Sequence, residues 1–243
     1  MRYFITLQYD GKNYHGWQIQ PNAITVEETI EKALATIFQQ SIDIVGAGRT
    51  DTGVHASMMV CHFDILQPIE DCNQLTYKLN KILPNDVCIN KIEHVDDDMH
   101  ARFSAKKRTY HYHIHTRKDA FLRNYSYYLT YPLDFEKMNK ACDMLLQQTD
   151  FRAFCKAGSD TKTTECIIYE AKWEKTHENS FMFIITANRF LRNMVRAIVG
   201  TLIEVGREKI TLSEFQDVIQ NGSRSDAGDS VPAHALFLTD IEY

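Results

Sequence analysis

The sequence lacks the features that mark membrane proteins, disulfide scaffolds and zinc modules. No apolar run approaches the ~18 residues that cross a membrane, so we expect no membrane segment. The six cysteines among 243 residues form no C-x-x-C pair, and their scattered spacing predicts reduced thiols without a structural zinc. Residues 1–6 alternate like a strand and resemble no signal peptide, so we expect a cytoplasmic protein.

The chain also lacks an excess of positive charge, since its formal net charge is −5. A nucleic-acid-binding protein needs positive charge on its binding surface, although its total charge need not be positive if the charges are segregated. Between residues 101 and 125 the only acid is Asp119. This stretch indicates either a phosphate-binding surface or an ordinary solvated face. Its basic residues are Arg102, Lys106, Lys107, Arg108, Arg117, Lys118 and Arg123.

Apolar residues at helical spacing predict four amphipathic helices. Two of them begin with a capping box, in which a threonine is followed three residues later by a glutamate. These boxes start at Thr25 and Thr211. The helices are expected over residues 25–39, from Asp134 onwards, over 190–205, and from Thr211 to just before Gly222.

Runs of β-branched and aromatic residues predict strands between these helices. Both halves of the chain follow a similar order of strands and helices. This order favours an α+β fold of two ferredoxin-like (RRM-like) halves, residues 1–104 and 105–243, with an extended, mostly antiparallel sheet and helices on one face. Strands are expected over 3–9, 43–46, 58–65, 87–95, 109–116, 167–174, 180–188 and 236–243.

The most informative segment is the glycine-rich run Gly46-Ala47-Gly48-Arg49-Thr50-Asp51-Thr52-Gly53. Three glycines in eight residues predict a loop with unusual backbone angles or a close approach of another chain. The loop presents Arg49 and Asp51 two residues apart. From spacing alone this is either a surface ion pair in an ordinary turn or a fixed carboxylate beside a cation. It is neither a dinucleotide-binding G-x-G-x-x-G loop nor a phosphate-binding P-loop.

Two further patterns carry polar side chains. His111, His113 and His115 face away from Tyr110 in a predicted strand. A metal could bind such a row, but no carboxylate or cysteine ligand is near in sequence, so we expect no metal site. Arginines at 189, 192 and 196 are spaced to lie along one edge of the predicted helix. Such arginines are either solvated or in contact with phosphate. We expect Arg189 to be solvated, while Arg192 is a candidate for phosphate contact.

Together these motifs resemble the tRNA pseudouridine synthase A family over residues 3–243. The glycine-rich loop resembles the family's G-x-x-R-T-D-x-G-V-H signature, which puts Asp51 at the position of the catalytic aspartate. The other matches follow in order along the chain. They are Tyr9-Asp10-Gly11 with Gly16-Trp17-Gln18, Thr25-Val26 at the first helix, Leu79-Asn80 with Leu83-Pro84 and Asp86 in a mid-domain loop, His100–Ala105 with Arg108 and Tyr110, Asn193–Arg196 with Val199-Gly200, and Pro232-Ala233-His234 with Leu236 and Leu238.

The resemblance implies an isomerase (an intramolecular transferase) that converts uridine to pseudouridine at positions 38–40 in the anticodon stem-loop of tRNA. It implies tRNA as the partner, no cofactor and no metal. It also implies an active-site cleft between the two halves, and a cytoplasmic homodimer whose clefts use both subunits.

The resemblance further implies a role for each matching residue. Asp51 attacks the target nucleoside at ribose C1′ or uracil C6, and a covalent intermediate divides a difficult exchange into two easier steps. Tyr110 stacks on the base and serves the removal of the C5 proton, while Arg196 pairs with the catalytic aspartate. The implied catalytic residues are Asp51, Tyr110 and Arg196, and the implied substrate-binding residues are Arg49, Tyr110, Leu236, Arg102, Arg108 and Arg192.

Some positions depart from the family's usual residues, which leaves other functions open. None of the departures removes a catalytic group; they fall at Glu27, Thr52, Cys155, Cys166 and Ala235. With the acidic net charge they leave open a paralogue that modifies other uridines. A non-catalytic RNA-binding module on the same fold is a second alternative. A third is an unrelated hydrolase that uses Asp51 and a histidine, which metal dependence would reveal.

Overall fold

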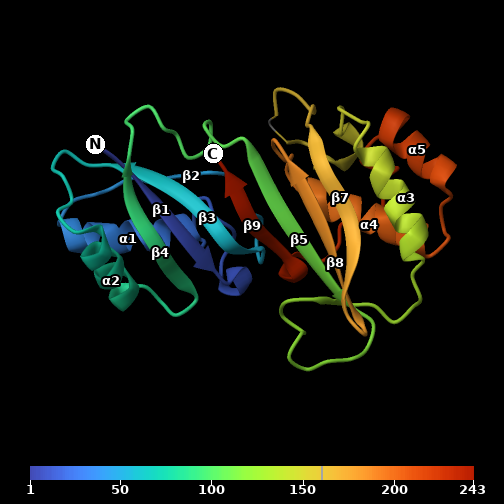
Figure 1. The fold of residues 1–243 in the computed structure, drawn as a ribbon, viewed down its shortest axis with the longest axis horizontal. Coiled ribbons are helices and arrows are strands. Elements are labelled where there is room, and N and C mark those ends of the chain that lie inside the picture. The colour runs from blue at the N-terminus through green and yellow to red at the C-terminus, as the bar shows by residue number, and fades with distance from the viewer. Residues whose placement is uncertain (160) are drawn as a thin grey trace. The chain divides into compact units, whose positions relative to one another are not determined.

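The computed structural model describes residues 1–159 and 161–243. The chain divides into two compact units, of which the first contains residues 1–106 and 237–243 and the second contains residues 107–236. Each unit combines a mostly antiparallel sheet with helices, as Figure 1 shows. The chain therefore passes between the units twice, at Lys106–Lys107 and at Leu236–Phe237.

The first unit has the strand order of a ferredoxin-like fold. Its strands run in the order β4-β1-β3, with β2 also paired to β3, and all of these pairs are antiparallel. The final strand β9 joins β3 in parallel, where His55 pairs with Phe237 and Ala56 with Leu238. The elements are β1 (Arg2–Tyr9), η1 (Gly11–Asn13), α1 (Val26–Phe38), β2 (Val45–Gly46), β3 (His55–Asp64), α2 (Cys72–Ile82), β4 (Val87–Val95) and β9 (Leu236–Glu242).

One face of this sheet forms the core of the first unit. Ile5 on β1 lies opposite Cys61 on β3 and Ile92 on β4, and all three are buried. Helix α1 covers this face, since the ring of Phe38 lies 6.2 Å from that of Phe63. The capping residue Thr25 accepts a hydrogen bond from the Glu28 backbone, so α1 begins where the capping box predicts.

The second unit is built around the antiparallel strands β5, β8 and β7 in that order, with the short β6 parallel to β5. Its chain order of strand, helix, two strands and helix is again ferredoxin-like, and β9 is the next strand along the chain. The elements are β5 (Lys107–His115), β6 (Tyr127–Tyr128), α3 (Phe135–Leu145), η2 (Arg152–Phe154), β7 (Ile168–His177), β8 (Ser180–Ala187), α4 (Met194–Gly206), α5 (Leu212–Asn221) and η3 (Ala233–Ala235).

Helix α3 covers one face of this second sheet. Tyr112, Phe183 and Trp173 lie side by side on β5, β8 and β7, and all are buried. The Asn139 side-chain amide on α3 donates to the backbone carbonyl of Trp173 at 3.2 Å. Its oxygen accepts a hydrogen bond from the backbone N–H of Trp173 at 2.7 Å. The Phe135 ring packs edge-on against the Trp173 indole, so α3 is fastened to this face by polar and apolar contacts.

The expected α+β class with two ferredoxin-like halves is confirmed, although three details differ. Helix α4 begins at Met194 rather than near 190, because Asn193 adopts a left-handed conformation with φ of 66°. Leu79 and Asn80, expected in a loop, lie in α2, where the Asn80 amide exchanges two hydrogen bonds of 2.8 Å with the backbone of Ile89. Residues 237–243, expected in the second half, belong to the first unit.

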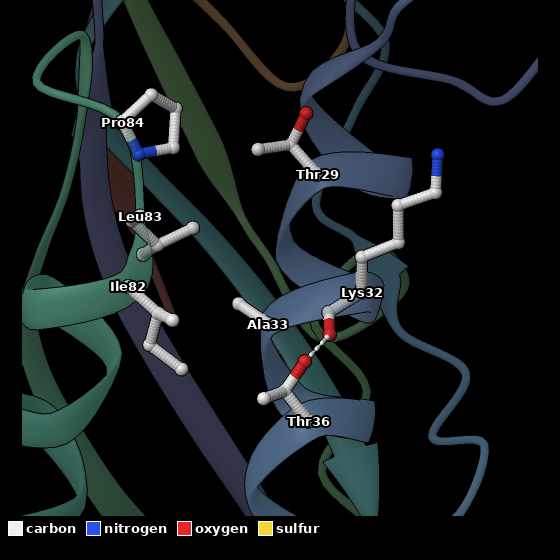
Figure 2. A pocket seen from close by; sticks show the side chains of 7 residues that line it. All are labelled: Thr29, Lys32, Ala33, Thr36, Ile82, Leu83 and Pro84. Atoms are coloured by element: carbon white, nitrogen blue, oxygen red, sulfur yellow. Dashed lines mark hydrogen bonds between the residues drawn. The ribbon is translucent and has the colours of Figure 1, made fainter.

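Two surface features bear on function. A hollow of about 220 Å³ lies on the helical side of the first unit, between α1 and the end of α2 (Figure 2). None of the candidate site residues lines it; its lining residues are Thr29, Lys32, Ala33, Thr36, Ile82, Leu83 and Pro84. Across residues 1–159 and 161–243, no helix is both long and apolar enough to cross a membrane.

Candidate active site

The loop that carries Asp51 is tied to the segment that follows β1. The backbone N–H of Trp17 donates to the Thr50 carbonyl at 3.2 Å, and that of Gly53 donates to the Tyr14 carbonyl at 3.3 Å. At the end of the loop, the Gly11 N–H lies 3.0 Å from the ring nitrogen Nδ1 of His55. Residues 9–17 therefore form a cradle, a term we keep for this segment, that fixes the course of the loop.

A buried hydroxyl pair fixes the loop next to Asp51. The Tyr9 hydroxyl lies 2.8 Å from Thr50 Oγ1, and both residues are buried. Thr50 is thus held by its side chain and, through the Trp17 N–H, by its carbonyl. Because Thr50 is bonded directly to Asp51, these contacts limit the positions that the Asp51 backbone can adopt.

Glycines allow the cradle and the loop to approach closely. At Gly16, φ is +89°, and a Cβ would lie 2.4 Å from the Thr50 carbonyl oxygen. A Cβ on Gly46 would lie 2.5 Å from the Trp17 ring, and Gly53 has φ of 77°. The expectation of unusual backbone angles is confirmed at Gly53, whereas the close approach at Gly46 is by Trp17 of the same chain. A Cβ on Gly48, by contrast, would have no described atom within 4 Å.

The exposed fractions alternate along the loop. Arg49 is exposed, Thr50 is buried and Asp51 is half-buried. The Asp51 carbonyl accepts a hydrogen bond of 3.1 Å from the Val54 N–H, which closes a turn directly after the aspartate. This alternation leaves Arg49 accessible to a ligand while Thr50 fixes the backbone between Arg49 and Asp51.

Asp86, which precedes β4, forms hydrogen bonds with three residues of the cradle. Its carboxylate accepts hydrogen bonds from the Tyr14 hydroxyl at 2.7 Å and from the Asn13 amide at 3.1 Å. Its carbonyl accepts from the Asp10 N–H at 2.9 Å. Burial, followed by the hydrogen bond to Asp86, raises the pKa of Tyr14, so its hydroxyl stays protonated as the donor.

In the second unit, the candidate Tyr110 lies on β5 opposite Ile185. Its half-buried ring contacts Phe190 edge-on, with ring centroids 5.1 Å apart and planes at 87°. Phe190 lies in the irregular segment before α4, and no sequence motif singled it out. An aromatic edge contact of this kind restricts the orientation of the Tyr110 ring.

Arg196, on the first turn of α4, is held by the segment that leads to Leu236. Its Nε donates to the Val231 carbonyl at 2.7 Å, while the Val231 N–H donates to the Arg196 carbonyl at 3.2 Å. The Tyr112 hydroxyl donates to the next carbonyl, that of Pro232, at 3.0 Å. These hydrogen bonds connect β5 and α4 through residues 231 and 232. Leu236 ends this segment and is buried.

The remaining arginines differ in their surroundings. Arg102 and Arg192 are exposed, and Phe103, beside Arg102, is 77% exposed. Arg108 is half-buried and donates to the Asn188 carbonyl at 2.9 Å, which gives it a structural contact. The expected edge of three arginines on one helix is wrong, because Arg192 and the residues before it precede α4.

Two of the three histidines of β5 contact each other, since the rings of His111 and His113 lie edge to face with centroids 6.3 Å apart, while His115 contacts β6 and the residue before it. His115 Nδ1 lies 2.9 Å from Ser126 Oγ, and its ring stacks on Tyr128. Burial lowers the pKa of His113 to about 4 and also lowers that of His111. Among the described residues, no group of three or more His, Cys, Asp or Glu side chains is arranged to hold a metal ion.

Comparison with known proteins shows the family of this chain. The model of the tRNA pseudouridine synthase family matches residues 5–104 and 141–243. The tRNA pseudouridine synthase A of Parabacteroides distasonis is 52% identical over 243 residues, covering 100% of this chain and 96% of the relative. That of Bacteroides fragilis is 50% identical over 242 residues with the same coverage, and that of Thermoanaerobacter pseudethanolicus is 42% identical over 241 residues, covering 98% of each chain. The chain belongs to the tRNA pseudouridine synthase family.

Proposed function

We propose that this protein converts uridine to pseudouridine in the anticodon stem-loop of tRNA, at positions 38–40, with Asp51 as the nucleophile. The full-length similarity to proteins named tRNA pseudouridine synthase A supports the reaction. The observation that carries the role of Asp51 is its place on a loop that the cradle holds at Thr50, Gly53 and His55. Within residues 46–55 Asp51 is the only carboxylate.

The reaction requires that the enzyme reach the glycosidic bond of the target uridine, which is shielded while the base is stacked in the RNA. The target uridine must leave the stack, as in other enzymes that act on a base. Attack by the Asp51 carboxylate at ribose C1′ or uracil C6 forms a covalent intermediate. The C1′–N1 bond breaks, the base turns, and a C1′–C5 bond forms. Release of Asp51, loss of the C5 proton and protonation of N1 complete an isomerisation that consumes no co-reactant and uses no cofactor.

The other candidate residues supply contacts that the carboxylate cannot. Tyr110 stacks on the base and its hydroxyl serves the C5 proton transfer; its ring is restricted by Phe190. Arg196 pairs with Asp51, and its Nε contact with Val231 restricts the directions in which its guanidinium can point. Leu236 supplies an apolar wall. It is bonded to Phe237, which pairs with His55 four residues after Asp51.

The substrate and the assembly complete the proposal. Arg49, Arg102, Arg108 and Arg192 contact RNA, and the enzyme acts as a cytoplasmic homodimer. Exposure of Arg49, Arg102 and Arg192 supports contact with phosphates. Segregation of basic residues between 101 and 125 reconciles RNA binding with the negative total charge.

The direct test uses the purified protein and unmodified tRNA transcripts. Pseudouridines are mapped after the reaction, in transcripts with uridine at positions 38–40 and in matched transcripts with cytidine there. We expect product only in the first set, with the same rate after treatment with a chelator. Product at other uridines would favour the paralogue, and tight binding without product would favour the RNA-binding module. Absence of pseudouridine, together with a hydrolytic activity that is lost on chelation, would favour the metal-dependent hydrolase.

A further inference from the structure

The segment between α5 and β9 folds over the first turns of α4, and one arginine holds its shape. The Arg224 guanidinium donates from Nη1 to the carbonyls of Ala227 and Gly228, at 3.3 and 3.1 Å. From Nη2 it donates to the Ser230 hydroxyl oxygen at 2.8 Å. Residues 224–231 form a strap, a name we keep for this segment, that closes around the guanidinium of its own first residue.

The strap is attached to α4 at successive points. The Gly228 N–H donates to Thr201 Oγ1 at 2.9 Å, and the Asn193 amide donates to the Ser230 hydroxyl oxygen at 2.6 Å. The approach is close enough to need glycine, because a Cβ on Gly200 would lie 1.8 Å from the Asp229 carbonyl oxygen. Asn193 thus places its side chain on the strap, and it makes no side-chain cap at the start of α4.

The end of the strap reaches the proposed catalytic machinery. Val231 exchanges two hydrogen bonds with Arg196, one with its backbone and one with its side chain. The position of the Val231 carbonyl therefore sets one of the contacts that orient the Arg196 guanidinium. Ser230, the residue before it, is fixed from both sides by Arg224 and Asn193.

We propose that Arg224 is a positioning residue for catalysis: it folds the strap so that the Val231 carbonyl orients Arg196. Only arginine carries several donors in a rigid planar fork that can reach three acceptors at once, whereas lysine has a single compact ammonium on a flexible stem. This inference rests on the proposed function, since it acts through the role of Arg196 toward Asp51.

The test compares Arg224→Ala and Arg224→Lys with a matched arginine that directly follows α4. Arg207, at the C-cap of α4, donates to Glu204 and lies over the Tyr131 ring, away from the strap. We expect kcat of Arg224→Ala to fall at least tenfold while KM for tRNA changes by less than about threefold. Added guanidinium ion at millimolar concentration restores part of the rate in Arg224→Ala, and Arg224→Lys stays impaired. We expect Arg207→Ala to lose about as much thermal stability as Arg224→Ala and to keep the wild-type kcat.

A double-mutant cycle with Arg196→Lys tests whether Arg224 affects kcat through Arg196. If Arg224 acts through Arg196, the loss of kcat on Arg224→Ala shrinks in the Arg196→Lys background. Equal losses in both backgrounds, or a wild-type kcat in both Arg224 variants, would overturn the inference.

Hydrogen exchange separates this inference from the proposed function. The Val231 amide bonds to the Arg196 carbonyl, so we expect its protection to fall in Arg224→Ala and to persist in Arg207→Ala. Unchanged protection would overturn the structural part of the inference. A wild-type protein that forms no pseudouridine would refute the proposed function, whatever the exchange result.

Discussion

The Tyr9 hydroxyl and the Thr50 hydroxyl lie 2.8 Å apart in the buried part of the first unit, although 41 residues separate them in sequence. Tyr9 ends β1, and Thr50 directly precedes Asp51. The pair connects a strand of the sheet to the loop that carries the proposed nucleophile. It links the stability of the core to the geometry that covalent attack requires, because small displacements of a reacting group slow a reaction strongly.

Replacing Tyr9 by phenylalanine tests this connection. The change leaves the Thr50 hydroxyl without this partner, so we expect unfolding free energy to fall by ~1 kcal/mol. Loosening of the loop next to Asp51 should lower kcat roughly tenfold, equivalent to ~1.4 kcal/mol in activation free energy. Urea unfolding and steady-state kinetics measure the two effects.

Tyr3→Phe is the matched control for that experiment. Tyr3 lies on the same strand, is equally buried, and accepts a hydrogen bond of 2.9 Å from the Ile69 N–H, far along the chain from the loop. It should lose similar stability and keep the wild-type kcat. Equal losses of kcat in both variants would show that the effect is general destabilisation.

Tyr110→Phe tests the proposed proton transfer. The ring and its edge contact with Phe190 remain, and the hydroxyl is removed. We expect kcat to fall by at least ~10²-fold, the usual contribution of a general acid or base, with tRNA affinity nearly unchanged. Single-turnover kinetics and filter binding measure the two quantities. A loss of affinity as large as the loss of rate would assign the hydroxyl to binding instead.

The salt dependence of tRNA binding tests the basic surface. Arg102 and Lys106 are both exposed. If each neutralises a phosphate, the double substitution to alanine should reduce the slope of log affinity against log salt by about 1–2. Arg152→Ala is the control, because Arg152 is exposed but paired with Asp150. An unchanged slope in the double variant would mean that these residues form only a solvated face.

Acid sensitivity of the first unit is expected from His62. Burial, followed by the charges of Arg2 and His100, lowers the pKa of His62 to about 4, against a smaller opposing effect of Asp64. Its Nδ1 accepts a hydrogen bond from the Ala101 N–H at 3.1 Å, which requires the unprotonated atom. Between pH 6.5 and about 4 the unfolded chain binds a proton that the folded chain does not. Stability therefore falls as pH falls through this window, by up to ~1.4 kcal/mol per pH unit.

His62→Asn should flatten that dependence by about one proton, because Asn retains an acceptor in place of Nδ1 and does not titrate. Trp17 reports on the first unit in a Trp173→Phe background. This replacement removes an indole N–H that is buried without a hydrogen-bond partner among the described residues. Urea unfolding followed by fluorescence between pH ~4.5 and ~7.5 measures the slope. An equal slope in both proteins would contradict the assignment to His62.

Local sequence patterns predicted what depends on short-range chemistry. The capping box at Thr211 is complete: the Thr211 side chain accepts from the Glu214 backbone N–H, and the Glu214 side chain accepts from the Thr211 backbone N–H. Both partners lie within one helical turn, so the sequence pattern predicts the contact. The β-branched and aromatic runs located the longer strands. Asp51, Tyr110, Arg196 and Leu236 were singled out by motif, and their catalytic and substrate-binding roles stay predictions.

Contacts across long separations could not be predicted in the same way. The start of α4 was misplaced because Asn193 adopts a left-handed backbone and bonds to Ser230, 37 residues away. Thr50 lay inside the recognised loop, yet nothing local indicated that Tyr9 holds it. No sequence motif singled out Arg224, and only the fold brings its strap to Arg196.

Asp51→Asn tests the central claim most directly. The substitution keeps the size of the side chain and removes the charge that covalent attack needs, while Arg49 and Arg196 remain available. Tritium release from C5-labelled tRNA and filter binding are measured on the same purified protein. We expect no detectable pseudouridine and tRNA affinity within about tenfold of wild type, or ~1.4 kcal/mol. Substantial turnover by the variant, after deamidation back to aspartate has been excluded by mass spectrometry, would contradict the assignment of Asp51 as nucleophile.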